Sequence, residues 1–298
     1  MEQLKQLLTA ADIAYKENEP LAAHCTFKIG GPARLFVQPT DRAQLCRAVA
    51  LCKAQGVRYY LLGNGSNILF ADEGYNGAVL DISSMQDAVE VHGTQLTAGA
   101  GVRLSALCKT ALEHGLTGLE FAYGIPGTVG GAVYMNAGAY GGEMKDVLIN
   151  SEYVSPDGTA GELDNEAMQL SYRHSAYEDG GLVITAASVR LTPGDPEQIK
   201  NTMHDIISRR RDKQPLEYPS AGSTFKRPEG HFAGALIEQC GLKGVSVGGA
   251  QVSEKHAGFI INRGGATASD ILSLIKHVQA RVKAQTGVTL ETEIRLIG

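Results

Sequence analysis

Glycine is concentrated in one stretch of this chain, and that stretch limits what the chain can fold into. Residues 118–142 read GLEFAYGIPGTVGGAVYMNAGAYGG, in which eight of 25 residues are glycine and none after Glu120 is charged. Glycine contributes no side chain to packing and loses much backbone entropy on folding, so this density needs a reason. One reason is a set of tight turns in a buried core. The other is a backbone cradle for a phosphate-bearing ligand, and this stretch alone leaves both open.

Local signals inside the stretch predict the start of a helix. Pro126 suits the first turn of a helix, and Gly127 and Thr128 would then lie where free N–H groups point outward. Because no Lys or Arg is present, a phosphate bound here would be neutralised by backbone amides and by the helix dipole.

A second uncharged glycine loop follows an apolar, strand-like run. Residues 61–70 read LLGNGSNILF after VRYYLL. The loop is not the dinucleotide fingerprint, because Ile68 stands where the third glycine should be, and no Gly-Lys-Ser/Thr of a Walker loop follows. Two neutral glycine loops far apart in sequence suit a ligand with a diphosphate and two large ends. They indicate a dinucleotide bound outside the usual Rossmann geometry.

Charge and cysteine content exclude several classes of protein. The chain has 298 residues, enough for two or three domains, and its net charge of −5 argues against non-specific nucleic-acid binding. Its five cysteines are odd in number and lack C-x-x-C spacing, so we expect no disulfide framework and no metal site. The N-terminus lacks the apolar core of a signal peptide, and no run reaches membrane-span length. We therefore expect a cytoplasmic protein without a membrane partner.

Hydrophobic periodicity and turn residues predict a mixed α and β chain. Asp41 is a good N-cap and Gly56 a good stop for the helix between them. Residues 33–70 make a βαβ unit that ends in a glycine loop, and residues 78–101 look antiparallel. Residues 1–20 are predicted as a short helix and a turn. Further helices are predicted at 104–114, 197–211, 233–240 and 268–286, and strands at 147–158, 181–191, 257–262 and 290–298.

Three polar spots are candidates for chemistry. Arg173 in SYRHSAY could hold an anionic group or a developing oxyanion, although an arginine stacked on tyrosine at the surface is the plainer reading. Ser223 in AGSTFK could present its hydroxyl from a Pro-rich loop, although most such serines cap turns. In LETEIRLIG, alternation places Glu291, Glu293 and Arg295 on one face of a final strand, where solvated side chains are the default. Composition does not choose among these.

The order and spacing of seven motifs identify a family. HCTFKIGGPARLF, LGNGSNIL, GIPGTVGGAVYMNAGAYGGE, YRHSAY, PSAGSTFKRP, GGAQVSEKHAGFIIN and ETEIRLIG together resemble the UDP-N-acetylenolpyruvoylglucosamine reductase family over nearly the whole chain. The resemblance implies an α+β protein with a p-cresol methylhydroxylase/vanillyl-alcohol oxidase-type FAD-binding fold in two subdomains, plus an α/β substrate-binding domain. The implied boundaries are 1–77, 78–192 and 193–298. It also implies non-covalent FAD, NADPH as co-substrate, and a monomer.

The family's functional residues carry over position by position. The catalytic set maps onto Arg173, Ser223 and Glu293, and Lys213 and Arg227 fall where the family handles the UDP-sugar. Only 50 positions separate Arg173 from Ser223, which leaves no room for the insertion of the larger subtype, so what closes the site is open. The residues implied to line FAD are Gly63, Asn64, Gly65, Ser66, Asn67, Ile68, Gly127, Thr128, Gly130, Gly131, Ala132, Asn136 and Gly138.

The resemblance also implies the reaction. NADPH delivers a hydride to FAD, which passes it to the terminal carbon of the enolpyruvyl ether, and negative charge develops on the adjacent carbon and its carboxylate. Arg173 would stabilise that charge, and Ser223 would donate the second hydrogen as a proton. Glu293 would be protonated or would use a bridging hydrogen bond, because a charged carboxylate beside an enolate repels it.

Two other functions are weighed against this one. A flavin oxidase of the same fold, acting on a hydroxy acid or alcohol, often holds its flavin covalently through His or Cys. Here His24 and Cys25 match that region poorly. A non-catalytic nucleotide-binding module would not react with NADPH. The motifs in the C-terminal part disfavour both alternatives.

Overall fold

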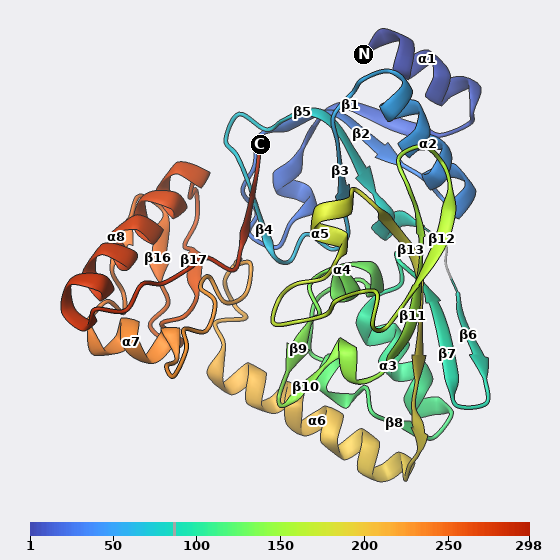
Figure 1. The fold of residues 1–298 in the computed structure, drawn as a ribbon. Helices are drawn as coiled ribbons and strands as arrows, with labels where there is room; N and C mark the ends of the chain where they lie inside the picture. The colour runs from blue at the N-terminus through green and yellow to red at the C-terminus, as the bar shows by residue number, and fades with distance from the viewer. Residues whose placement is uncertain (86–87) are drawn as a thin grey trace. The chain divides into compact units, whose positions relative to one another are not determined.

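The chain forms two compact units that are both discontinuous in sequence. A computed structural model describes residues 1–85 and 88–298 (Figure 1). Unit 1 comprises residues 1–17, 35–64 and 77–209, and unit 2 comprises residues 18–34, 65–76 and 210–298. The family resemblance implies a different division, into 1–77, 78–192 and 193–298 according to what each segment binds, and this division stays a prediction.

The N-terminal elements build a four-stranded sheet and two helices. Helix α1 (Glu2–Ala10) packs on α2 (Arg42–Ala54), and Asp41 caps α2 by accepting the N–H of Gln44 at 2.8 Å, as predicted. The polar run at 14–20 was not predicted as a strand. Strand β3 pairs in parallel with β5, which lies between the two strands of the predicted βαβ unit. In sheet order the strands are β1 (Ala14–Pro20), β2 (Pro32–Gln38), β5 (Tyr75–Asp81) and β3 (Tyr59–Leu62).

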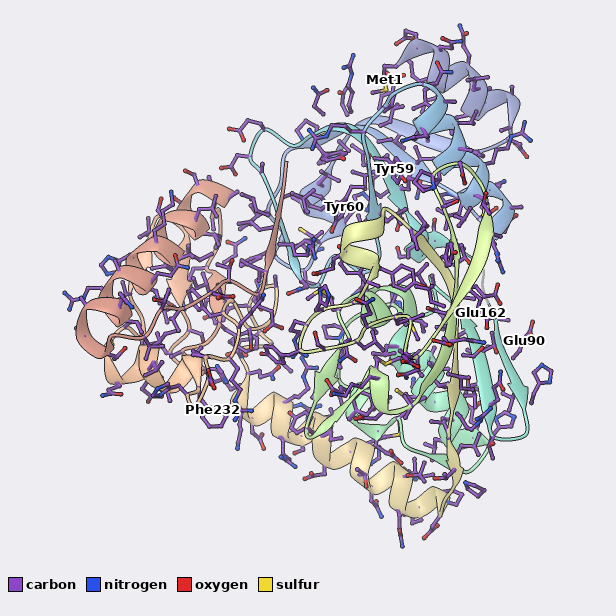
Figure 2. The ribbon with its side chains drawn as sticks, viewed as in Figure 1. Met1, Tyr59, Tyr60, Glu90, Glu162 and Phe232 are labelled. Atoms are coloured by element: carbon purple, nitrogen blue, oxygen red, sulfur yellow. The ribbon has the colours of Figure 1, made fainter. Side chains whose placement is uncertain are left out.

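A five-stranded antiparallel sheet forms the middle of unit 1. Helix α4 (Val129–Tyr134) packs on β13, and α3 (Leu104–Glu113) packs on β7. Figure 2 shows Glu90 and Glu162 on the two edge strands of this sheet. The antiparallel arrangement predicted around 78–101 is confirmed for the strands at 89–92 and 95–99, whereas residues 78–81 belong to β5, which pairs in parallel with β3. In order the strands are β12 (Ala160–Asp164), β11 (Leu148–Val154), β13 (Val183–Arg190), β7 (Gln95–Gly99) and β6 (Val89–His92).

Short elements complete unit 1. Two antiparallel pairs connect the larger elements, β8 with β14 and β9 with β10. Their bounds are β8 (Leu116–Thr117), β14 (Thr192–Pro193), β9 (Gly138–Ala139) and β10 (Gly142–Glu143). The remaining helical turns are α5 (Tyr177–Gly180), η2 (Ile82–Ser84), η3 (Glu120–Ala122) and η4 (Met144–Asp146).

Unit 2 places two helices beside a three-stranded sheet (orange and red in Figure 1). Helix α8 (Ala268–Thr286) packs on strands β15 and β16 and matches its predicted bounds. Thr267 and Asp270 cap each other's backbone at its start, and Gly287 ends it with a left-handed φ of 74°. The other elements are η1 (Leu21–His24), α7 (Ala233–Gln239), β15 (Ser246–Val247), β16 (Ala250–Val252), β17 (Ile260–Asn262) and α6 (Pro196–Lys213), which begins in unit 1. Over the described ranges, no helix is both long and apolar enough to cross a bilayer.

The final strand is shorter than the alternation at 290–298 predicts. Strand β18 covers only Arg295–Ile297 and pairs in parallel with β4 (Ile68–Phe70). Thr292 instead bridges Phe225. The prediction that Glu291, Glu293 and Arg295 share one strand face is therefore wrong, because the segment changes partner between Thr292 and Arg295.

Burial protects the cysteines, all five of which are free thiols. Burial raises the pKa of Cys52 and of Cys108 to about 12, so at pH 8 their thiolate fraction is on the order of 10⁻⁴. Cys25 and Cys240 are also buried, whereas Cys46 is only half-buried. We expect a thiol reagent at pH 8 to label the native protein slowly, with Cys46 first, and to label all five cysteines in guanidinium. Mass spectrometry of labelled peptides measures this, and rapid native labelling of Cys52 or Cys108 would contradict the buried packing.

Candidate active site

The first glycine loop leaves four successive backbone amides unused. Within the described ranges 1–85 and 88–298, no N–H of residues 64–67 donates a hydrogen bond to a protein acceptor. Gly65 has a φ of +59°, and a Cβ added there would lie 2.4 Å from the carbonyl oxygen of His24. The tight backbone contact therefore requires glycine at this position. The result is an uncharged turn whose N–H donors have no acceptor among the described residues, as an anion cradle needs.

The second glycine loop uses most of its amides internally. Helix α4 begins at Val129 with Thr128 as N-cap, so Pro126 lies before the helix and not in its first turn as predicted. The N–H groups of Val129 and Gly130 donate to Val102 and Ala100 at 2.8 and 2.9 Å. These amides are committed because the loop packs against the start of α3 and the end of β7.

Two positions in the second glycine loop, Gly127 and Thr128, have space or a donor that the protein does not use. Gly127 is the glycine at which an added Cβ would meet only the Ile125 side chain, at 3.9 Å. The Thr128 N–H has no acceptor in the described part of the chain.

The two glycine loops contact each other within unit 1, where the Asn64 side chain donates to the Pro126 carbonyl at 2.8 Å. A Cβ added at Gly63 would lie 2.6 Å from Oγ1 of Thr128.

Arg173 lies in a short loop with an unusual backbone. Its φ is +57°, a left-handed conformation that is uncommon for a residue other than glycine. One guanidinium nitrogen, Nη2, donates to the Gly138 carbonyl at 3.2 Å, and the guanidinium carbon stacks 5.0 Å from the Tyr172 ring centre. The side chain is half-buried. This setting is compatible with an arginine that is simply stacked on a tyrosine. It is equally compatible with one that holds an anionic group, because the bond to Gly138 fixes the direction of the guanidinium.

Asn136 faces the protein. It is fully buried, and its carboxamide bonds to Glu143, Ser171 and Lys145. Of the residues predicted to line the cofactor, Asn136 is therefore the one whose side chain is most clearly occupied by protein groups. Ala132 is buried within α4, and Ile68 is buried in β4.

In unit 2, the loop of Ser223 and the segment of Glu293 are joined by one residue. Ser223 is exposed, and the next residue, Thr224, is fully buried. The Thr224 carbonyl accepts the N–H of Glu293 at 2.8 Å, and Oγ1 of Thr224 accepts the N–H of Ile260 at 3.0 Å. Ser223 and Glu293, which are far apart in sequence, are thereby connected through the backbone hydrogen bond between Thr224 and Glu293. Sequence reasoning missed Thr224, because a lone threonine beside a serine carries no signal of its own.

The first glycine loop is fastened to these segments. The Asn67 carboxamide donates to the carbonyl of Glu293 at 3.4 Å. Thr26 accounts for a second connection, because its N–H donates to Gly65 O at 3.0 Å and its hydroxyl to Ser220 O at 2.6 Å. These two bonds connect the loop of Gly65 with the loop of Ser220.

The two basic side chains predicted to bind the substrate, Lys213 and Arg227, are exposed on unit 2. Lys213 is exposed at the end of α6. Arg227 is exposed and stacks on the ring of Phe232, labelled in Figure 2, at 3.9 Å. A guanidinium on an aromatic face keeps its positive charge. Among the described residues, no His, Cys, Asp and Glu side chains gather in a group that could hold a metal ion.

The predicted residues divide between the units. Unit 1 carries the second glycine loop, Asn136, Gly138 and Arg173, together with Gly63 and Asn64. Unit 2 carries Ser223, Glu293, Lys213, Arg227 and the rest of the first loop from Gly65 onward. Each unit therefore supplies part of both the cofactor set and the catalytic set.

Two family profiles match different parts of the chain. A profile described as "FAD binding domain" matches residues 33–164. A profile described as "UDP-N-acetylenolpyruvoylglucosamine reductase, C-terminal domain" matches residues 214–297. The first profile contains both glycine loops, and the second contains the serine loop and Glu293.

Curated relatives match nearly the full length. A UDP-N-acetylenolpyruvoylglucosamine reductase of Clostridium botulinum is 50% identical over 281 residues, covering 94% of this chain and 92% of the relative. The reductase of Caldanaerobacter subterraneus subsp. tengcongensis is 46% identical over 298 residues, covering 100% of this chain and 98% of the relative.

Two solved structures are similar to this chain, one over nearly its full length and one over 64% of it. The UDP-N-acetylenolpyruvylglucosamine reductase of Thermus caldophilus is 34% identical, with a TM-score of 0.80 over 96% of this chain and 99% of its own. A BBE-like 1 variant of Physcomitrella patens is 22% identical, with a TM-score of 0.50 over 64% of this chain and 44% of its own. The second likeness concerns the fold alone.

Proposed function

The chain belongs to the UDP-N-acetylenolpyruvoylglucosamine reductase family, and from this premise we propose that it reduces UDP-N-acetylglucosamine enolpyruvate to UDP-N-acetylmuramate, with FAD as cofactor and NADPH as reductant. This is a step of peptidoglycan precursor synthesis. The observation that carries the proposal is 50% identity to a curated reductase over 94% of the chain. The predicted FAD-binding fold of the p-cresol methylhydroxylase/vanillyl-alcohol oxidase type is confirmed.

The glycine loops fit a non-covalent FAD. The unused N–H groups of residues 64–67 and of Thr128 provide donors for a diphosphate, and Gly127 leaves room for a close approach. His24 and Cys25, the residues considered for a covalent link, are bonded to Glu19 and to the Ile29 carbonyl. We infer that FAD is released on acid precipitation. The implied division of labour is FAD binding by residues 1–77 and 78–192 and substrate binding by residues 193–298.

The chain's own residues provide charge stabilisation and a proton. The two glycine loops would hold FAD, which would supply the hydride-transfer chemistry between NADPH and the terminal enolpyruvyl carbon. Arg173 stabilises the negative charge that develops beside that carbon and in the carboxylate. Ser223 donates a proton to that adjacent carbon, and its exposed hydroxyl has no acceptor within the described residues. Glu293 holds the substrate carboxylate through a shared proton or a bridging hydrogen bond, and Lys213 and Arg227 bind the UDP diphosphate.

A direct assay tests the proposed activity. The purified protein should be yellow, should consume NADPH rapidly only when the enolpyruvyl UDP-sugar is present, and should form UDP-N-acetylmuramate. Equal NADPH consumption with oxygen alone and no sugar product would point to a flavin oxidase instead. We also expect a cytoplasmic monomer, which fractionation and light scattering measure.

Gly127 offers a sharper test of the cradle than Gly65 or Gly130. A valine at Gly65 or Gly130 clashes with the protein itself, since an added Cβ lies 2.4 Å from His24 O or 2.8 Å from Ala100 Cβ. Either variant can therefore lose FAD simply by misfolding. The Cβ of Gly127→Val meets only the Ile125 side chain at an ordinary van der Waals distance of 3.9 Å, so we expect a folded protein with a near wild-type melting temperature after FAD removal, but with much lower FAD occupancy. Full occupancy in Gly127→Val would remove residue 127 from the cofactor site. Gly127→Ala provides the intermediate step.

A further inference from the structure

Both donor hydrogens of the Asn136 carboxamide are used by protein acceptors. Its Nδ2 donates to Oε2 of Glu143 at 2.9 Å and to the Ser171 carbonyl at 3.0 Å, and its Oδ1 accepts the Lys145 N–H at 2.9 Å. An asparagine side chain has two donor hydrogens, so none is left for a ligand. The residue is fully buried and its own φ is +39°. A buried polar network in which every donor is used is rigid.

Those bonds connect two segments that both touch Arg173. On one side is the loop of residues 171–175, and on the other is the β9–β10 hairpin, whose Gly138 carbonyl accepts from Arg173 at 3.2 Å. A further bond holds the same loop to helix α4, because the buried Ser175 hydroxyl donates to the carbonyl of Tyr134, the last residue of α4, at 2.7 Å. The Arg173 loop is thus fixed just before and just after the arginine.

The backbone of Arg173 explains why such fixing is needed. A left-handed φ of +57° is disfavoured for arginine, and it persists only where the surrounding structure holds it. We propose that Asn136 is a positioning residue for Arg173, whose carboxamide locks the 171–175 loop to the hairpin and so aims the guanidinium. This inference rests on the catalytic role proposed for Arg173. It assigns Asn136 a role through Arg173 in place of the direct cofactor contact implied by resemblance.

The test uses FAD-loaded Asn136→Ala with Asn165→Ala as its matched control. Asn165 also lies in unit 1 and donates from its carboxamide to two carbonyls, those of Lys145 and Leu148 at 2.9 and 2.8 Å. Hydrogen exchange measured by mass spectrometry gives a readout independent of activity. In Asn136→Ala, peptides covering residues 169–177 should exchange on the order of tenfold faster, and in Asn165→Ala they should not. Unchanged exchange in Asn136→Ala would overturn the proposal.

Kinetics then ask whether the effect passes through Arg173. Asn136→Ala should slow substrate reduction on the order of 10²-fold, with FAD affinity within about twofold of wild type. In an Arg173→Ala background the same substitution should add no more than about twofold, because residues that act as a unit are not additive. A full additional loss, or weaker FAD binding in both backgrounds, would mean that Asn136 acts on the cofactor and would overturn the proposal.

The two proposals fail differently. If Arg173→Ala alone reduces the substrate at the wild-type rate, the catalytic role of Arg173 is wrong. The exchange experiment still decides whether Asn136 holds the 171–175 loop. If exchange and additivity both behave as expected, Asn136 belongs to the machinery that aims Arg173.

Discussion

Replacing Ser223 by alanine is expected to slow turnover on the order of 10²–10⁴-fold while leaving folding and FAD content intact. The loss follows because a positioned general acid contributes about that factor, and the substituted protein has no hydroxyl to donate. The structural change is small, because the Ser223 side chain is exposed and the loop is held by the neighbouring Thr224.

Two rapid-mixing experiments separate the chemical roles in Ser223→Ala. Mixing with NADPH alone should remove the flavin absorbance at the wild-type rate, since that half of the reaction needs no proton at carbon. Adding the enolpyruvyl UDP-sugar without oxygen should then restore the absorbance slowly. If the first mixing is the slow one, or if product forms at the normal rate, then Ser223 is a turn residue and Glu293 or an ordered water is the next donor to test.

Arg173→Lys is expected to lower kcat on the order of 10²–10³-fold with a much smaller change in KM. Lysine keeps the positive charge but loses the planar fork, in which one nitrogen donates to the Gly138 carbonyl at 3.2 Å while the others keep a fixed direction for a carboxylate. Arg263→Lys is a matched control, because Arg263 also stacks on a tyrosine, Tyr218, at 4.8 Å. Steady-state kinetics of both variants, at equal FAD content, measure the difference. A raised KM with normal kcat in Arg173→Lys would make Arg173 a substrate anchor.

Helix boundaries were predictable where side chains cap the backbone. Thr267 and Asp270 form the capping box that starts α8, and Gly287 ends it, so sequence alone gives the bounds of this helix. Asp41 does the same for α2. These signals are local and depend on a few neighbouring residues.

Elements that depend on distant partners were missed or misjudged. The run at 14–20 alternates too few apolar residues to indicate a strand, and it becomes β1 only through its sheet neighbour. The alternation at 290–298 is real, yet Thr292 pairs with Phe225 and Arg295 with Ile68, which breaks the strand. Residues 18–34 and 65–76 belong to unit 2 because they contact residues that are distant in sequence, and no local pattern reveals such contacts.

The site was predictable as a set of positions but not as a set of contacts. Glycine density located both loops, and the structure leaves amides of 64–67 unused, while those of Val129 and Gly130 are occupied. Asn136 shows the limit most clearly. The family resemblance implied that Asn136 contacts the cofactor, whereas the direction of its carboxamide is set by Glu143 and Ser171, which follow later in the chain.

The pairing of β18 with β4 has a consequence for synthesis on the ribosome. Asn67 and Glu293, which this pairing brings together, are 226 residues apart, so the nascent chain carries β4 without its partner through most of translation. The three β4 residues, all apolar and buried in the finished protein, are meanwhile an open strand edge of the kind that aggregates. Closing so long a loop is also slow. In a newly made molecule, the segment that carries Glu293 therefore reaches its place beside Asn67 only after β18 has been synthesised.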